Sequence, residues 1–268
     1  MKNILDHGYL KLVETWGSDR AIVESARMST DKGFLGWGPK IADEPCDGCD
    51  GKGIRDDRGF PLRGQPFFAT EVCGICDGDK LKRVPGDEKL LRFLYENKHS
   101  TPFEFAGLTI EAQAPLMVFR EWHRHRVPFG YSEQSARYVE MPELFYVPSM
   151  ERLSMGGQSK TNKQSSGAVL DARVVEETQL RIDATSRRAF AEYRAMIADG
   201  VAKELARLVL PVNTYSRMRA TGNLRGWLGF LTLRTAPGAQ WEIRMYAQEV
   251  AELLRTAFPR TMELFDGK

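Results

Sequence analysis

All four cysteines of this chain lie in one stretch that has too little apolar material to build a core of its own. They form two CxxC pairs separated by 23 residues: Cys46 and Cys49, then Cys73 and Cys76. The surrounding segment, residues 31–86, is rich in Gly, Asp and Pro. A unit of this size needs a cross-link to hold its shape. We therefore expect a cross-linked module, residues 40–80, inserted into a single domain that spans residues 1–268.

A zinc ion bound by the four thiolates is the cross-link that we expect. Two CxxC pairs in a chain without a secretory signal are typical of a closed, tetrahedral, structural zinc site. Glycines follow each pair, as the tight turns around such a metal require. A redox-active dithiol or a pair of disulfides is the alternative. In either case no cysteine is left over to act as a nucleophile.

The composition of the whole chain is that of an ordinary globular protein. It has 268 residues, of which 42% are hydrophobic and 28% charged, and its net charge is +2. A charge this small argues against bulk binding to nucleic acid or to a membrane surface, so any anion site must be local. No apolar run approaches the roughly 20 residues of a membrane span. We expect a cytoplasmic protein with no membrane partner.

The hydrophobic pattern outside the module predicts a mixture of helices and strands. Ala106, Leu108, Ile110 and Ala112 alternate with more polar residues, which indicates a half-buried strand. The other expected elements are a strand or turn followed by a helix in 1–30, helices over 87–99 and 171–198, a helix opened by Pro115 that runs to Arg126, a surface loop over 150–170, a short helix over 202–211 and a final helix over 239–258. Together they predict an α/β or α+β fold with a mixed sheet.

Positive charge is concentrated between Phe119 and Tyr138, in the stretch FREWHRHRVPFGYSEQSARY. Arg124, His125 and Arg126 would lie in the last turn of a helix, where cations are favourable even without a function. The positive charge continues to Arg137, with Ser135 nearby. Arginine supplies charge and serine a directed hydrogen bond, a combination that suits phosphate.

Further polar residues lie beside apolar sequence later in the chain: Arg207, Asn223, Arg225 and Arg234. Basic side chains on buried elements are costly unless a ligand or partner pairs them. The chain contains neither GxxxxGK[ST] nor GxGxxG after a strand, so side chains must hold the phosphates. These residues favour a site for a nucleotide together with a dinucleotide cofactor.

Four ordered motifs of this chain resemble those of the flavin-dependent thymidylate synthases. RHRVPFGYSEQSARY resembles the family signature RHRxxSxNExSxRY, and HSTPFEF resembles its H-x-T-P-F-E segment. ARLVLPVNTYS resembles the arginine and Leu-Pro stretch, and NLRGWLGFLTLRTAPGAQWEIRMYA resembles N-x-R…L-R…A-Q-x-E-I-R. The resemblance covers about residues 1–30 and 88–260. It does not include the CxxC module.

The resemblance implies a fold, a reaction and a set of partners. It implies a homotetramer of α/β subunits whose active sites are shared between subunits. It implies FAD reduced by NADPH, and transfer of a one-carbon unit from methylenetetrahydrofolate to C5 of dUMP. It also implies roles for individual residues. The expected cofactor-binding residues are Ser29, His99, Thr101, Glu104, Arg124, His125, Arg126, Asn223, Arg225 and Gly229. The expected substrate-binding residues are Glu121, Glu133, Ser135, Arg137, Arg207 and Arg234.

The chemistry of the residues agrees with this reaction. Uracil C5 is a weak nucleophile, and the chain has no spare cysteine to add at C6. Activation must then be electrostatic, by a fixed guanidinium that stabilises charge developing on the ring. The reducing equivalents must come from a cofactor. We expect Arg234, Ser135 and Arg124 to act in catalysis, with Arg234 next to the pyrimidine.

Three departures from the family pattern leave alternatives open. The loop between Arg126 and Ser135 has one extra residue, Glu121 stands where the family typically has Gln, and Gly229 replaces an expected Asn. A carboxylate only accepts hydrogen bonds, so Glu121 either pairs with a nearby arginine or faces a donor such as the cytosine amino group. C5 methylation or hydroxymethylation of another nucleotide such as dCMP is thus the first alternative. A zinc-containing nucleic-acid-binding protein is a remote alternative, because the acidic cysteine segment would repel the phosphate backbone of a nucleic acid.

Overall fold

A computed structural model describes residues 3–38, 40–46, 54–55, 71–72, 80–84, 86–160 and 166–267. The chain forms two compact units, one built from Met1–Ser18 with Phe103–Lys268 and the other from Asp19–Pro102. We describe each unit by itself, beginning with the larger. The prediction of one domain with an insertion at 40–80 stays a prediction.

The larger unit is built on a five-stranded antiparallel sheet. Its strand order is β1-β2-β7-β11-β8, with bounds β1 (Asn3–Ile4), β2 (Gly8–Trp16), β7 (Gly107–Pro115), β11 (Tyr215–Asn223) and β8 (Gly130–Glu133). We expected a mixed sheet, and this part of the prediction was wrong. The chain returns from β7 to the same end of the sheet, where Tyr215 pairs with Pro115, so the two central strands run antiparallel.

The alternation of side chains explains why these segments form strands. In β7, Leu108, Ile110 and Ala112 are fully buried, as the sequence pattern predicted. In β11, Met218 and Ala220 are buried while Arg217, Arg219 and Thr221 are exposed. A period of two places alternate side chains on opposite faces of a strand. One face of the sheet therefore contributes to the core.

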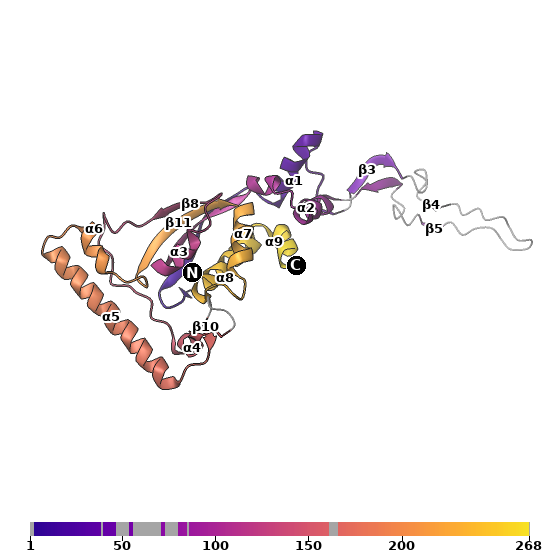
Figure 1. The fold of residues 1–268 in the computed structure, drawn as a ribbon. Coiled ribbons are helices and arrows are strands. Elements are labelled where there is room, and N and C mark those ends of the chain that lie inside the picture. The colour runs from indigo at the N-terminus through magenta and orange to yellow at the C-terminus, as the bar shows by residue number, and fades with distance from the viewer. Residues whose placement is uncertain are drawn as a thin grey trace, which may run out of the picture. The chain divides into compact units, whose positions relative to one another are not determined.

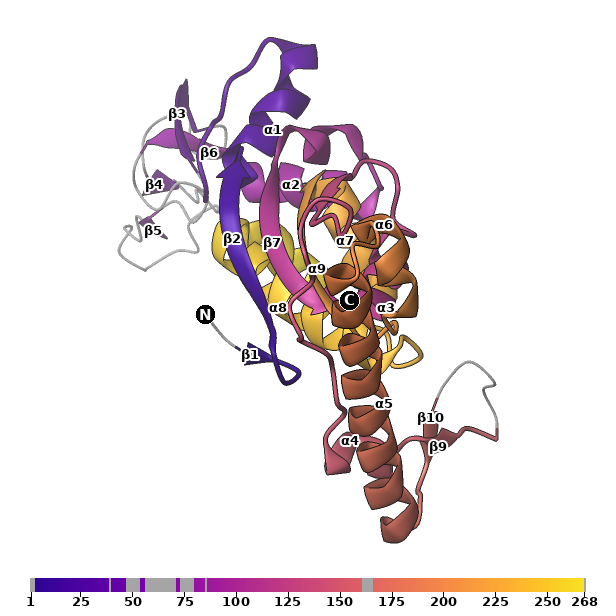
Figure 2. The ribbon, with the colours of Figure 1, turned by 90° about the vertical axis from the view of Figure 1, so that its left-hand side faces the viewer.

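Helices α3, α7 and α8 pack on that face (Figures 1 and 2). Their bounds, with that of the helix that follows, are α3 (Leu116–Trp122), α7 (Leu224–Arg234), α8 (Trp241–Ala257) and α9 (Pro259–Asp266). Aromatic rings fill the space between them: Trp122 stacks on Phe230 at 5.1 Å and meets Tyr246 edge-on at 6.1 Å. These contacts join the ends of α3 and α7, which hold the candidate site.

The remaining elements of the larger unit lie near the two ends of the long helix α5, with α4, β9 and β10 at one end and α6 at the other (Figure 2). The bounds are α4 (Met150–Ser154), β9 (Gly157–Gln158), β10 (Ser166–Ala168), α5 (Ala172–Ala198), α6 (Lys203–Ala206) and η3 (Arg207–Val209). Asp171 caps α5, as its side chain accepts a hydrogen bond from the N–H of Arg173 at 2.9 Å. A second apolar cluster packs Phe190 and Tyr193 of α5 against Phe145.

The smaller unit contains short elements. They are α1 (Asp19–Arg27), η1 (Met28–Thr30), β3 (Lys40–Pro45), β4 (Ile54–Arg55), β5 (Glu71–Val72), β6 (Leu81–Val84) and α2 (Asp87–Glu96), and η2 (Thr101–Phe105) spans the boundary of the two units. Strand β3 pairs with β6, and β4 with β5, both antiparallel. Cys46 is buried at the end of β3, where its N–H donates to the carbonyl of Lys80 at 2.9 Å.

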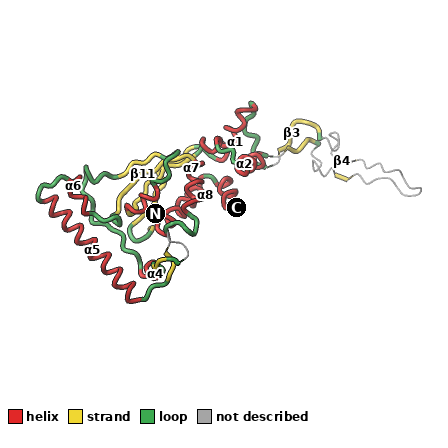
Figure 3. Tube along the Cα trace, in the orientation of Figure 1, coloured by secondary structure: helices red, strands yellow, loops and turns green. Residues whose placement is uncertain are grey.

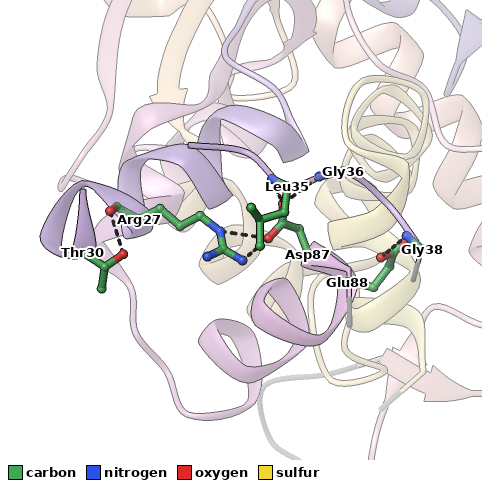
Figure 4. Close-up of polar contacts among 7 residues, drawn as sticks. All are labelled: Arg27, Thr30, Leu35, Gly36, Gly38, Asp87 and Glu88. Carbon is green, nitrogen blue, oxygen red and sulfur yellow. Dashed lines mark hydrogen bonds and ion pairs between the residues drawn. The ribbon is translucent and has the colours of Figure 1, made fainter. Parts of the chain in front are cut away.

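A buried carboxylate organises the start of α2 (Figure 4). Asp87 is fully buried, and its side chain accepts hydrogen bonds from the guanidinium of Arg27 and from the N–H groups of Leu35 (2.6 Å) and Gly36 (3.1 Å). Glu88 accepts from the N–H of Gly38 at 2.6 Å. These contacts connect the residues that precede β3 with the residues that follow β6.

The sequence predicted most of these elements correctly. The helices expected over 87–99, 171–198 and 239–258 are α2, α5 and α8, and helices and a sheet coexist as expected (Figure 3). The loop expected over 150–170 contains α4, β9 and β10 instead. No helix of the described residues is long and apolar enough to cross a membrane.

Candidate active site

The Arg-His-Arg segment begins where α3 ends. We expected α3 to run to Arg126, but it ends at Trp122, and His123 is its C-cap. The hydroxyl of Tyr131 from β8 donates to the carbonyl of His125 at 2.6 Å and lies 3.2 Å from that of Trp122. The carbonyl of Trp122 at the helix end also accepts from the N–H of His125 at 3.0 Å, so the chain turns here with its carbonyls paired. Arg124 and Arg126 are therefore exposed in a turn rather than in a helical face.

Arg234 is the best-anchored arginine of this region. It is the last residue of α7, and its side chain is only 15% exposed. Its Nε donates to Nε2 of His125 at 2.9 Å, and its two terminal nitrogens donate to Oε2 (2.6 Å) and to the backbone carbonyl (2.9 Å) of Glu121. Three acceptors around a planar guanidinium fix its orientation.

The ring of His125 is neutral at physiological pH. Burial, with the nearby charge of Arg234 as a second cause, lowers the pKa of His125 from 6.5 to about 4. A neutral imidazole can accept a hydrogen bond at one nitrogen, and the contact with Arg234 assigns that role to Nε2. The proton of the ring then lies on Nδ1.

A cavity of about 450 Å³, here named the Asn223 cavity, lies beside His125. Five of the expected cofactor-binding residues line it: Glu104, His125, Asn223, Arg225 and Gly229. Glu104 and Arg225 form an ion pair at 2.5 Å, and the Oδ1 of Asn223 accepts from the N–H of Gly226 and caps α7. A side chain at Gly229 would meet no atom within 4 Å, so this wall of the cavity is open.

Apolar side chains form the other wall of the Asn223 cavity. Val127, Pro128, Phe129 and Leu233 line it, and Val127 is 90% exposed. Phe129 packs edge-on against Trp227 at 4.7 Å, which holds its ring in place. Apolar surface beside an ion pair and a neutral imidazole suits a large ligand with a flat ring and polar substituents.

A second cavity, of about 770 Å³ and here named the Arg234 cavity, has Arg234, the hydrogen-bond partner of His125, in its wall. It is lined by Glu121, Arg124, Arg234 and the segment 238–240. Arg124 makes no hydrogen bond or ion pair with any residue in the described part of the chain, so its guanidinium is available to an anion. Among the described residues, this cavity is lined by two arginines and one carboxylate, and by no cysteine.

The remaining substrate candidates lie elsewhere in the larger unit. Ser135 and Arg137 follow β8, and Glu133 pairs with Met218 of β11. Arg137 forms an ion pair with Glu204 of α6 at 3.2 Å, close in sequence to Arg207 of η3. A single chain thus places Arg137 beside the α6–η3 segment, and neither Arg137 nor Arg207 lines the Arg234 cavity.

The other candidates belong to the smaller unit or lie outside the described residues. Ser29 is exposed on η1, where its hydroxyl donates to the carbonyl of Ala26, and His99 and Thr101 are exposed after α2. Cys49, Cys73 and Cys76 lie outside the described residues. Within the described ones, no group of three or more His, Cys, Asp or Glu side chains could hold a metal ion.

Two contributions to the site were not expected from the sequence. Tyr131 holds the Arg-His-Arg turn, although it lies in the loop that departs from the family pattern. The segment 238–240 lines the Arg234 cavity from the residues just before α8. Ala239 and Gln240 belong to a motif of the sequence, but the motif does not indicate which cavity these residues line.

This chain is similar in sequence to a known family of proteins. The family model described as "Thymidylate synthase complementing protein" (Thy1) matches residues 11–260. A flavin-dependent thymidylate synthase of Thermus thermophilus is 33% identical over 98% of this chain and 77% of its own length. One from Thermosipho africanus is 32% identical over 78% of this chain and 91% of its own.

Solved structures of the UMP/dUMP methylase PolB from Streptomyces cacaoi are also similar to this chain. The complex with 5-Br dUMP has a TM-score of 0.70 and 29% identity, and covers 99% of this chain and 97% of PolB. The complex with 5-Br UMP has a TM-score of 0.72 and 27% identity, and covers 99% and 96%. From residue 11 to residue 260 this chain therefore belongs to the Thy1 family, and it is an enzyme of that family.

Proposed function

We propose that this enzyme methylates C5 of dUMP to give dTMP, with methylenetetrahydrofolate as the one-carbon donor and NADPH as the source of reducing equivalents. FAD, when bound, supplies the redox chemistry between NADPH and the nucleotide. The family match and the relatives' names support the reaction class. The observation that supports the mechanism is a single one: a guanidinium is held by three acceptors at the wall of a large cavity whose described lining residues include no cysteine.

The Asn223 cavity fits the flavin. Its apolar wall offers a surface for a flat ring system, and the open wall at Gly229 leaves room for it. Glu104 and Arg225 present a carboxylate and a guanidinium to polar substituents, and neutral His125 offers an imidazole N–H. Ser29, His99 and Thr101, which lie in the smaller unit, stay proposed as cofactor-binding residues on the resemblance alone.

The Arg234 cavity is assigned to the nucleotide. Arg234 donates to the pyrimidine and stabilises negative charge that develops on it, which replaces activation by a cysteine. Arg124 supplies a second positive charge in the same cavity. A guanidinium that is already oriented does not have to reorganise as charge develops, which makes its stabilisation more effective.

Ser135, Arg137 and Arg207 are assigned to the phosphate and sugar, and we propose that another copy of the chain brings them to the cavity. Exposed apolar side chains surround Arg207 on α6 and η3: Leu205 is 55% exposed and Leu208 77%. An exposed apolar surface of this kind, next to the charge of Arg207, is typical of a protein–protein interface. We propose a homotetramer whose active sites are shared between subunits. Measurement of the molar mass of the enzyme in solution tests this proposal. A structural zinc in the 40–80 module completes the proposal.

A second substrate has specific support. Glu121 presents a carboxylate in the Arg234 cavity, and a carboxylate can also accept from the amino group of cytosine. C5 methylation or hydroxymethylation of dCMP is therefore the alternative, and the names of the PolB structures add UMP to the nucleotides worth testing.

A product assay distinguishes these possibilities. The purified enzyme is incubated with FAD, NADPH and methylenetetrahydrofolate, and with dUMP, UMP or dCMP in separate reactions. Mass spectrometry of the nucleotide then identifies the product. Gain of a methyl group by dUMP supports the proposal. A reaction with dCMP alone, or a hydroxymethyl product from dUMP, contradicts it.

A further inference from the structure

Tyr131 lies on β8, in the loop that departs from the family pattern, so the resemblance implies no role for it. It pairs with Ala220 of β11 in the antiparallel sheet, which fixes its backbone. Its hydroxyl reaches back to the turn after α3, where it donates to the carbonyl of His125 at 2.6 Å. Burial raises the pKa of Tyr131, so the hydroxyl keeps its proton and remains a donor at physiological pH.

Both backbone polar groups of His125 are held by hydrogen bonds. Its N–H donates to the carbonyl of Trp122 at 3.0 Å, and its carbonyl accepts from Tyr131. In the described part of the chain, this carbonyl has no second donor. His125 lies outside any helix or strand, so no regular ladder of hydrogen bonds would hold its carbonyl if the hydroxyl of Tyr131 were removed.

Aromatic contacts fix the ring of Tyr131 independently of its hydroxyl. The ring stacks on Phe129 with 5.8 Å between the centroids and an angle of 10° between the planes, and His123 meets it edge-on at 5.0 Å. Phe129 in turn lies edge-on to Trp227 at 4.7 Å. A Cβ at Gly222 would lie 2.7 Å from the ring of Phe129, so a glycine makes room for it. Removal of the hydroxyl alone should therefore leave the ring of Tyr131 in place.

The side chain of His125 transmits the position of the turn to Arg234. Two rotatable bonds join the backbone to the imidazole ring, and the ring packs against Phe230 at 4.9 Å. Nε2 of the ring accepts from Nε of Arg234 at 2.9 Å. Such hydrogen bonds span only about 2.7–3.2 Å, so a displacement of the ring by about 0.5 Å would weaken this one. The orientation of Arg234 thus depends in part on where the turn holds His125.

We propose that Tyr131 is a positioning residue of this enzyme: its hydroxyl fixes the turn so that His125 holds Arg234 in the orientation that the reaction needs. This inference rests on the proposed function, in which Arg234 stabilises charge on the pyrimidine. Tyr131 lines neither the Asn223 cavity nor the Arg234 cavity, so it acts through His125 rather than on a ligand. A misplacement of about 1 Å can lower the rate of an enzyme about 100-fold.

The pKa of His125 reports whether the turn is held. Burial, and after it the charge of Arg234, lowers this pKa to about 4, while the charge of Glu121 opposes the shift. Glu104 and Arg225, which line the same cavity as His125, pair with each other. A loosened turn would make the ring less buried and weaken its contact with Arg234. The pKa of His125 should then rise toward its ordinary 6.5.

An NMR titration of Tyr131→Phe tests this role without reliance on turnover. The chain has four histidines, so in enzyme that contains isotope-labelled histidine the variant His125→Gln identifies the ring signal of His125 as the one that disappears. We expect the pKa of His125 to rise to about 5 or higher in Tyr131→Phe, since loss of a buried hydrogen bond changes such an equilibrium by about tenfold. For the same reason the rate of dTMP formation should fall about tenfold at unchanged flavin content.

Tyr9→Phe is the matched control. The hydroxyl of Tyr9 donates to Glu111 at 3.0 Å on the sheet, and Tyr9 lines neither cavity. This variant loses a hydrogen bond of the same kind, and it should keep both the pKa of His125 and the rate of the wild type. Urea unfolding of both variants measures the stability that each loses, which separates a general loss of stability from a loss of positioning.

The outcomes separate the role of Tyr131 from the proposed function. An unchanged pKa of His125 in Tyr131→Phe would show that the hydroxyl does not hold the turn, and the role would be wrong. A raised pKa with an unchanged rate would show that the reaction does not need this hold, and the role would again be wrong. If the wild type forms no dTMP, the proposed function fails, while the titration still decides whether Tyr131 holds His125.

Discussion

Arg234 donates a hydrogen bond from Nε to Nε2 of His125 at 2.9 Å, although the two residues are 109 positions apart in the sequence. His125 lines the Asn223 cavity and Arg234 lines the Arg234 cavity, so this one contact joins the walls of both. The bond requires a neutral imidazole, since a protonated ring has no acceptor. Protonation of His125 would therefore remove one of the three acceptors that hold Arg234 in place.

This contact predicts a pH dependence of stability. The pKa of His125 is about 4 in the folded protein, against an ordinary 6.5. Between these values the unfolded chain binds a proton that the folded chain does not, so the free energy of unfolding decreases as pH falls from about 6.5 to about 4. His125→Gln keeps an acceptor for Arg234 but does not titrate. Urea unfolding at several pH values should show a shallower decrease for this variant, and parallel curves for the two proteins would contradict the assignment.

Arg234→Ala is predicted to abolish turnover while the flavin stays bound. Removal of an oriented donor at a developing charge typically lowers the rate by about 10²–10³. Arg234→Lys keeps the charge but cannot satisfy three acceptors, so it should be almost as slow. The rate of dTMP formation and the visible flavin absorbance are measured on the same samples. Turnover at the wild-type rate in Arg234→Ala would show that another group activates the pyrimidine.

The sequence predicted the residues of the site better than their pairings. It placed Glu121 among the arginines nearby in the chain, yet its partner is Arg234, 113 positions away. Local sequence does not show which elements pack together. It is the packing of Trp122 on Phe230 that brings the ends of α3 and α7 to one place.

The ends of elements were predicted less well than their existence. The proline after Val127 correctly indicated that α3 must stop, but the helix ends earlier, at Trp122, and the turn that follows is held by the hydroxyl of Tyr131 from β8, which donates to the carbonyl of His125. Such a tertiary contact has no local signal. Strand β11, in contrast, had one: Met218 and Ala220 alternate with Arg217 and Arg219, a period of two that is typical of a strand.

Arg207→Ala is predicted to weaken nucleotide binding without loss of flavin. If Arg207 reaches the phosphate from another copy of the chain, its removal eliminates a charge-assisted hydrogen bond, and the Kd of dUMP should rise about tenfold. Arg188→Ala removes an exposed positive charge from α5 and is the matched control. An unchanged Kd in Arg207→Ala would mean that the phosphate is held elsewhere.

Asp87→Ala is predicted to destabilise the smaller unit strongly. Loss of the buried carboxylate would leave the guanidinium of Arg27 and the N–H groups of Leu35 and Gly36 without their acceptor (Figure 4). Breaking a buried charged pair costs about 3–5 kcal/mol. Glu88→Gln retains an acceptor oxygen for Gly38 and should cost about 1 kcal/mol or less. Urea unfolding compares the two variants, and equal stabilities would contradict the role of Asp87.

The zinc prediction is tested by metal analysis of the purified enzyme. Four thiolates that form one closed site should hold about one zinc per chain. Cys73→Ser should lose the metal, since three ligands do not close a tetrahedral structural site. Because a structural zinc contributes folding energy to its own module, proteolysis of this variant should begin within residues 40–80. A wild-type enzyme without zinc would contradict the prediction. Thiol titration with and without reductant would then distinguish disulfides from free thiols.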